Sequence, residues 1–250
     1  MIHGYLLLHT GEINKARRYY EDAAASARRR GDRQTAGWGQ LGIARIHLAQ
    51  GRPDAALVAL ELAAPSVTDA LGSVELHGMS ALAHLRAGDA AQALRCARSG
   101  LQMLRTSRPV SFTTLTGTAG VAATFNGLLA QALHDGVAGD AAMLKREARQ
   151  ALGLLKRFAG IFAIGWPQFY LQQGNLALAL GSRQYALKAW RKSAESAAAL
   201  AMPYDEALAL LVLAQYEGGL SGTVAHARAS ALLEGMALPE PPSLFPHTRR

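Results

Sequence analysis

The segment Gly174–Ser193, GNLALALGSRQYALKAWRKS, contains a spacing of glycine and small residues that recurs along the chain. In this segment Gly181 follows Gly174 by seven residues and precedes Ala186, Trp190 and Ser193 by five, nine and twelve. The same offsets occur in Gly4–Ala23 around Gly11, in Ala44–Ala63 around Gly51 and in Ala81–Gly100 around Gly88. Two antiparallel helices approach closely only where both present small side chains, and the turn between them favours glycine. The spacing therefore predicts helix pairs, with the larger residue of the ninth offset packed between one pair and the next.

Repetition of this pair predicts an all-α fold. A single pair leaves one apolar face uncovered, so neighbouring pairs must stack to form a core. We predict a right-handed superhelix, an α-solenoid, of about six antiparallel pairs over residues 1–237, with Gly136 and Gly218 at the two less regular turns. The predicted first helices are residues 1–10, 34–50, 70–87, 111–134, 166–180 and 203–217, and the second helices are 12–30, 53–64, 90–105, 140–158, 183–201 and 223–236.

Composition and local punctuation agree with a helical array. The chain has 50 Ala and 38 Leu against 8 Val and 6 Ile. Alanine and leucine favour helices and the β-branched residues favour strands, so a β-sandwich, a barrel or a large parallel sheet is excluded. Gly31-Asp32 and Gly88-Asp89 each place a helix-ending glycine before an N-cap residue, and Pro53 suits the first turn of a helix.

The termini and the cysteine content bear on location. No secretory signal precedes Glu12, and the uncharged windows Val110–His134 and Phe158–Ser182 carry too many polar residues for a membrane span. The single Cys96 excludes an internal disulfide framework and fits a reducing compartment, so we expect a cytoplasmic protein. The proline-rich residues 238–250 predict a disordered tail.

The charge balance limits the choice of partner. Lys and Arg number 26 and Asp and Glu number 18, which gives a net charge of +8. Such an excess favours an acidic protein, nucleic acid or anionic lipid as partner. The run Arg28–Arg30 with Arg33 is interpreted as a solvated helix end, since cations interact favourably with a helix C-terminus. Nucleic acid is disfavoured, because the aromatic residues are few and mostly fall at packing offsets, as Tyr20 and Trp190 do, and no helix-turn-helix or zinc-finger pattern occurs.

No combination of residues points to catalysis, a cofactor or a metal. The chain contains no P-loop, H-E-x-x-H or G-x-S-x-G motif. Gly37–Gly42 has the form G-x-G-x-x-G, but it lies inside a predicted helix rather than between a strand and a helix. His77 and His84 are seven residues apart with no nearby cysteine, which favours packing over metal binding. Cys96 lies beside alanines without a histidine base, so a packed thiol is the better interpretation.

The repeat resembles the tetratricopeptide repeat, although its units are longer than that family's usual ~34 residues. The stretch Ala186–Tyr216 resembles the last repeats in the C-terminal region of bacterial class III adenylate or guanylate cyclases that carry an ATPase module. There a tryptophan at the position of Trp190 recurs, as does a turn like Met202-Pro203-Tyr204-Asp205. Regulators of the maltose-activator type contain similar arrays. Ala201 departs from the glycine usually found before the Met-Pro-Tyr turn.

The resemblance implies that chemistry resides in upstream cyclase or ATPase domains, with which the array could make cis contacts. Met1 falls inside the first helix of the first predicted pair, whose turn is at Gly11. We therefore expect this chain to be a fragment, or a shortened descendant, of a larger signalling protein.

Two functions follow as hypotheses. The first is a non-enzymatic scaffold that binds a protein or peptide, which could be acidic, on the concave face lined by the first helices. By repeat offset, the residues predicted to bind the partner are Tyr5, His9, Trp38, Arg45, Glu75, Arg86, Gln168 and Asn175. Tyr, Trp and Arg are the residue types most often found at binding hot spots. The alternative is a regulatory or sensor segment of a larger cyclase, ATPase or transcription regulator.

Overall fold

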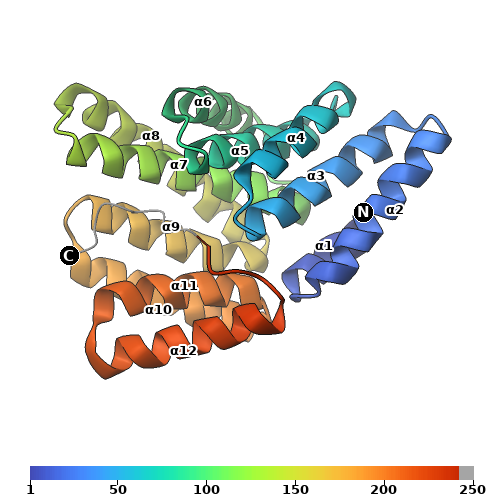
Figure 1. The fold of residues 1–250 in the computed structure, drawn as a ribbon. Coiled ribbons are helices and arrows are strands. Elements are labelled where there is room, and N and C mark those ends of the chain that lie inside the picture. The colour runs from blue at the N-terminus through green and yellow to red at the C-terminus, as the bar shows by residue number, and fades with distance from the viewer. Residues whose placement is uncertain (242–250) are drawn as a thin grey trace. The chain divides into compact units, whose positions relative to one another are not determined.

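The computed structural model describes residues 1–241, apart from the side chain of Ala138. Helices occupy most of this part of the chain, and it contains no strand (Figure 1). The helices are α1 (Ile2–His9), α2 (Ile13–Arg29), α3 (Arg33–Ala49), α4 (Pro53–Ala63), α5 (Ala70–Arg86), α6 (Ala90–Thr106), α7 (Leu115–His134), α8 (Ala138–Ile161), α9 (Trp166–Ala179), α10 (Arg183–Ala199), α11 (Pro203–Glu217) and α12 (Gly219–Gly235). Three short 3-10 turns are η1 (Ala64–Ser66), η2 (Phe112–Thr114) and η3 (Ala163–Gly165). The all-helical prediction and its twelve helices are confirmed.

The helix ends follow the turn chemistry read from the sequence. The turn glycines of the six predicted pairs, from Gly11 to Gly218, all have φ between 67° and 85°, a region that side chains disfavour. At the start of α3 the carboxylate of Asp32 accepts a hydrogen bond from the N–H of Thr35 at 3.0 Å. The largest differences from the predicted bounds are the start of α7, where residues 112–114 form η2 instead, and that of α12, four residues earlier.

The small-residue seams face inward, as predicted. Ala44, Ala81, Ala56, Ala93 and Ala186 are each fully buried. The ninth-offset aromatics fill the space that the glycines leave. A methyl group on Gly42 would lie 2.3 Å from Cδ1 of Tyr20, and one on Gly174 would lie 2.3 Å from Nε1 of Trp190. Glycine at these positions therefore lets the neighbouring helix rest directly on the ring.

The chain divides into two compact units, which are described separately. Unit 1 comprises Met1–Leu8 and Glu12–Thr124, and unit 2 comprises His9–Gly11 and the chain from Phe125 onward, so the boundary falls within α7. In unit 1, α2 packs on α3, α3 on α4, α4 on α5 and α5 on α6. In unit 2, α9 packs on α10, α10 on α11 and α11 on α12 (Figure 1). Sequence alone predicted one array over residues 1–237 and did not reveal this division.

Apolar clusters stabilise these stacks. A cluster in unit 1 contains Leu41, Ala44, Leu48, Ala56, Ala59, Leu60, Ala63, Met79 and Ala83. A cluster in unit 2 contains Leu171, Ala177, Ala186, Trp190, Leu213 and Ala225. Both are rich in alanine, which lets helix axes approach closely because its side chain is a single methyl group.

The last residues bear on two further expectations. Leu238 is buried, and its N–H donates to the carbonyl of Leu233 at 2.9 Å to close the end of α12. The rest of the predicted disordered tail, residues 242–250, lies outside the described residues. Within residues 1–241, no helix is both long enough and apolar enough to cross a membrane.

Ala201 is expected to carry backbone strain that glycine would relieve. It has φ of 52° in the turn between α10 and α11, in the left-handed region that costs an alanine about 1 kcal/mol. We expect Ala201→Gly to raise the free energy of unfolding by up to about 1 kcal/mol in urea titrations. The matched control is Ala227→Gly, at an exposed position within α12, which should lower it by about 1 kcal/mol. Equal losses in the two variants would contradict the strain argument.

Candidate functional site

The inner side of unit 1 contains a buried ion pair between two first helices. Arg45 on α3 donates from Nε and Nη2 to Oε2 of Glu75 on α5, at 3.0 and 2.6 Å. The guanidinium carbon of Arg45 also lies 5.3 Å from the ring centroid of Tyr5 on α1. Only 8% of Arg45, 2% of Glu75 and 1% of Tyr5 is exposed. The repeat offsets thus did identify residues that meet in space, but they meet in the interior.

A segment of the same chain covers this cluster. The hydroxyl of Tyr5 donates to the carbonyl of Phe112 at 3.0 Å, and Nη2 of Arg45 lies 3.4 Å from the carbonyl of Thr113. The N–H of Gly117, in the first turn of α7, donates to Oε1 of Glu75 at 2.7 Å. All three contacts are to backbone atoms of residues 112–117. The part of the predicted partner face formed by Tyr5, Arg45 and Glu75 is therefore covered by η2 and the start of α7.

The environment of the ion pair sets its protonation. Burial raises the pKa of Glu75 above its ordinary value, although Arg45 and the Gly117 N–H favour the carboxylate. Burial alone would lower the pKa of Arg45, but Glu75, Tyr20 and Tyr5 together raise it above its ordinary value. The guanidinium of Arg45 therefore stays charged. Of the two groups, Glu75 is the one that burial shifts toward its neutral, protonated form.

Two other predicted residues of unit 1 remain half-buried. Nε1 of Trp38 donates to Asp69 at 3.3 Å, and Nη1 of Arg86 donates to the carbonyl of Leu48 at 2.8 Å. Each side chain thus has a partner within the unit and keeps part of its surface exposed.

The predicted residues of unit 2 form polar contacts within the unit. Nε2 of Gln168 donates to Asp205 at 2.6 Å, and Nδ1 of His9 lies 3.9 Å from the same carboxylate. Burial raises the pKa of Asp205 to about 6, while the hydrogen bond from Gln168 opposes that shift. Asn175 is buried and accepts a hydrogen bond from Nε1 of Trp190 at 3.0 Å. As a set, Tyr5, Arg45, Glu75 and Asn175 are inaccessible to a partner in this conformation.

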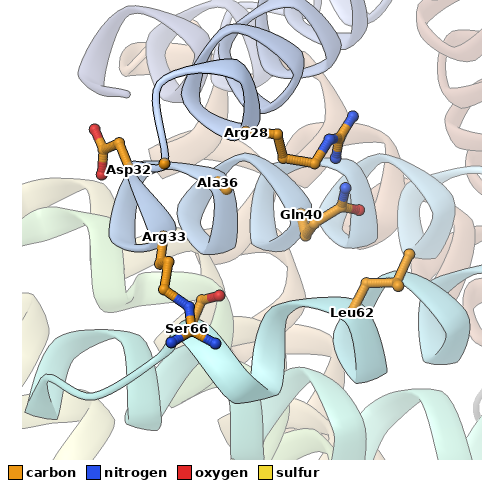
Figure 2. Close-up of a pocket in the computed structure, with 8 residues that line it drawn as sticks. Arg28, Asp32, Arg33, Ala36, Gln40, Leu62 and Ser66 are labelled. Carbon is orange, nitrogen blue, oxygen red and sulfur yellow. The ribbon is translucent and has the colours of Figure 1, made fainter.

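An open pocket lies elsewhere in unit 1, in a groove with α3 as its floor and α2 and α4 as its walls (Figure 2). Its volume is about 270 Å³. The lining residues are Arg28, Gly31, Asp32, Arg33, Ala36, Gln40, Leu62 and Ser66. We name this surface the α2–α4 groove and include in it Val58, which is exposed one turn before Leu62 on the same helix.

Two exposed arginines and an apolar ridge characterise the α2–α4 groove. Arg28 and Arg33 are exposed, and neither forms an ion pair with a carboxylate of residues 1–241. Asp32 also lines the pocket, but its hydrogen bond from the Thr35 backbone lowers its pKa and engages it as a helix cap. Val58 and Leu62 are 58% and 61% exposed. The sequence pattern indicates only a solvated helix end for Arg28–Arg30 and Arg33. It does not predict that Arg28 and Arg33 line a pocket.

The lining of the pocket can form hydrogen bonds, ion pairs and apolar contacts with a bound group. The pocket combines guanidinium, amide, hydroxyl and apolar groups, and the pKa of its one carboxylate, Asp32, is lowered by the hydrogen bond from Thr35. Within the described part of the chain, no cluster of three His, Cys, Asp or Glu could hold a metal ion. Burial raises the pKa of Cys96, which makes this thiol a poorer nucleophile.

Comparison with known proteins found no family model that matches the sequence and no curated protein that matches it. Inference of function therefore depends on the geometry of two surfaces of unit 1. One surface is already covered by the chain's own residues 112–117, and the α2–α4 groove is open.

Proposed function

We propose that this protein is a non-enzymatic interaction scaffold that holds a segment of a partner protein in the α2–α4 groove. The observation that carries the proposal is the pocket, in which exposed Leu62 lies opposite Arg28 across the floor residue Gln40 (Figure 2). An apolar side chain of the partner would pack on Leu62, which removes both from water. A polar group of the partner would bind the guanidinium of Arg28.

The size of the pocket favours a protein partner over a cofactor. Its volume of about 270 Å³ is below the ~300–1,000 Å³ of most small-molecule sites. A pocket of this size accommodates a side chain or two from a longer segment. Val58 continues the apolar ridge by one turn, so a segment lying along α4 would bury both residues.

The proposal extends to the type of helical repeat. We infer that the pairs form a right-handed superhelix of tetratricopeptide type, because the turn glycines, the buried alanines and the ninth-offset aromatics follow one spacing. Trp38 and Arg86 in unit 1 and, separately, His9 and Gln168 in unit 2 are retained as secondary partner contacts, since each is only half-buried. A cytoplasmic location would suit the unpaired Cys96.

A peptide library displayed on phage and selected against the full chain tests the groove. We expect peptides to be enriched that bind the protein and lose about tenfold in affinity with Leu62→Ser, the loss of about 1.4 kcal/mol of apolar contact. Leu220→Ser is the matched control, because Leu220 is 81% exposed on α12 in unit 2 and lies outside the groove. Enriched peptides that bind both variants equally well would show that the groove is not the docking surface.

A second candidate is the regulatory segment of a larger signalling protein. The observation in its favour is the left-handed Ala201, at the position where the resembled cyclase-type repeats have glycine. A repeat descended from one with glycine at this turn would retain the left-handed conformation at Ala201. If this function is correct, a cyclase or ATPase domain of such a protein should bind the chain in analytical ultracentrifugation. Absence of a complex with these domains would contradict it.

A further inference from the structure

The α2–α4 groove presents positive charge that the described chain leaves unneutralised. Arg28 belongs to the last turn of α2, and Arg33 is the first residue of α3. Both are exposed, and residues 1–241 supply no carboxylate that pairs with either one. An arginine pairs strongly with a carboxylate, because its planar guanidinium can donate two parallel hydrogen bonds to it.

The two guanidiniums flank the pocket rather than forming one cluster. In Figure 2 Arg28 extends from α2 over Gln40, whereas Arg33 extends from the start of α3 toward Ser66. The carboxylate of Asp32 points away from Gln40 and Leu62 in the same view. The groove is therefore positive at two separated points, with Leu62 on the opposite wall.

We propose that the partner segment in this groove is acidic, with Asp or Glu carboxylates on Arg28 and Arg33 and an apolar side chain on Leu62 and Val58. This inference rests on the proposed function, whose docking surface it shares. The net charge of +8 would accelerate the encounter with such a segment, since long-range attraction raises association rates.

The lining favours an acidic peptide over a nucleic acid. Proteins that bind single strands combine basic residues with aromatic rings on which bases stack. The pocket is lined by arginine, glycine, aspartate, alanine, glutamine, leucine and serine, with no ring among them. A phosphate backbone would also leave the exposed side chains of Leu62 and Val58 without an apolar contact.

Fluorescence anisotropy with the full chain tests the chemistry of the partner. The probes are labelled synthetic peptides of Glu and Leu, the same peptides with Lys or Ser in place of Glu, and a single-stranded oligothymidylate. The test variant is Arg28→Glu with Arg33→Glu. The control is Arg146→Glu with Arg149→Glu on exposed positions of α8, which changes the net charge equally in unit 2. Circular dichroism verifies that each variant is folded.

We expect the Glu-Leu peptide to bind the unmodified chain more tightly than the Ser and Lys peptides or the oligothymidylate. Affinity for it should fall at least tenfold in the test variant and about twofold in the control. The Lys-Leu peptide should bind the test variant more tightly than it binds the unmodified chain. This reversal would identify the two arginines as the contact points.

Several outcomes would overturn the inference. Equal losses in the two double variants would mean that overall charge, not the groove, attracts the peptide. Tighter binding of the oligothymidylate would assign the basic groove to nucleic acid. If Leu62→Ser abolishes binding of the selected peptides while Arg28→Glu with Arg33→Glu has no effect, the scaffold function stands and the acidic partner is wrong. If neither change affects binding, both proposals fail.

Discussion

Arg45→Ala is expected to lower the free energy of unfolding of this protein by about 3 to 5 kcal/mol. The substitution leaves Glu75 buried beside the start of α7 with the hydrogen bond from Gly117 but without its cation. Removing Arg45 costs far more than the ion pair contributes. The charge of Glu75 stays buried, and it loses the Coulomb attraction that had offset its removal from water. The substitution also removes the contact of the guanidinium with the ring of Tyr5.

The pH dependence of the variant identifies the cause. A raised pKa in the folded state means that stability is fully present below the unfolded value, ordinarily 4.5 for Glu75, and is lost as pH rises through the folded value. Without Arg45 the folded pKa of Glu75 should rise further. The destabilisation should therefore be largest near neutral pH and should shrink as the pH is lowered toward 4.5.

Urea unfolding followed by circular dichroism at several pH values measures this effect. Arg45→Met with Glu75→Leu should recover most of the lost stability, since replacing both charges with apolar groups of similar size is often neutral or favourable. Arg95→Ala is the control, because Arg95 lies on the exposed side of α6 and should change stability by no more than about 0.5 kcal/mol. A pH-independent loss in Arg45→Ala would mean that lost packing, not the charge of Glu75, is responsible.

The local part of the fold was predictable from the sequence. A turn glycine such as Gly51 and a cap such as Asp32 act within a few residues of themselves, so their spacing fixes the helix ends. The aromatic offsets were also informative, because Tyr20 and Trp190 pack on glycines of adjacent helices. These features depend on neighbours in sequence, which an offset pattern records.

The interior position of the predicted binding residues was not predictable in the same way. Arg45 meets Glu75 and Thr113, which are 30 and 68 residues away, and Glu75 meets Gly117 at a separation of 42. Offsets within a repeat place Arg45 and Glu75 on one face, but they do not say that residues 112–117 return to cover it. The uncharged window Val110–His134 was the available signal, but an uncharged stretch does not say which other helices it packs against.

The α2–α4 groove escaped sequence reasoning for a different reason. Leu62 belongs to an apolar helix whose other residues, such as Leu60, enter the core, so its residue type does not mark it as exposed. Arg28 and Arg33 were correctly expected to be solvated. What the sequence lacked was their proximity to Leu62, which depends on how α2 and α4 pack on either side of α3.

Gly117→Ala is expected to destabilise the protein by about 3 kcal/mol, because α5 and α7 touch through their backbones at this point. An added methyl group would lie 2.4 Å from the carbonyl oxygen of Val74 and 2.6 Å from Cα of Glu75. The reciprocal position is equally close, since a methyl group on Gly78 would lie 2.0 Å from the carbonyl oxygen of Gly117. No side chain can rotate away to make room, so the helices must separate, and separation would also lengthen the bond from Gly117 to Glu75.

The control for this substitution is Gly153→Ala in α8. Gly153 is exposed, and an added methyl group would meet no atom within 4 Å, so only the intrinsic helix preference remains. Alanine in place of glycine should then stabilise the helix by up to about 1 kcal/mol. The same intrinsic gain applies at Gly117, so the measured loss there understates the steric cost by about that amount. If urea titrations gave Gly117→Ala the stability of Gly153→Ala, α5 and α7 would not be in backbone contact at this point.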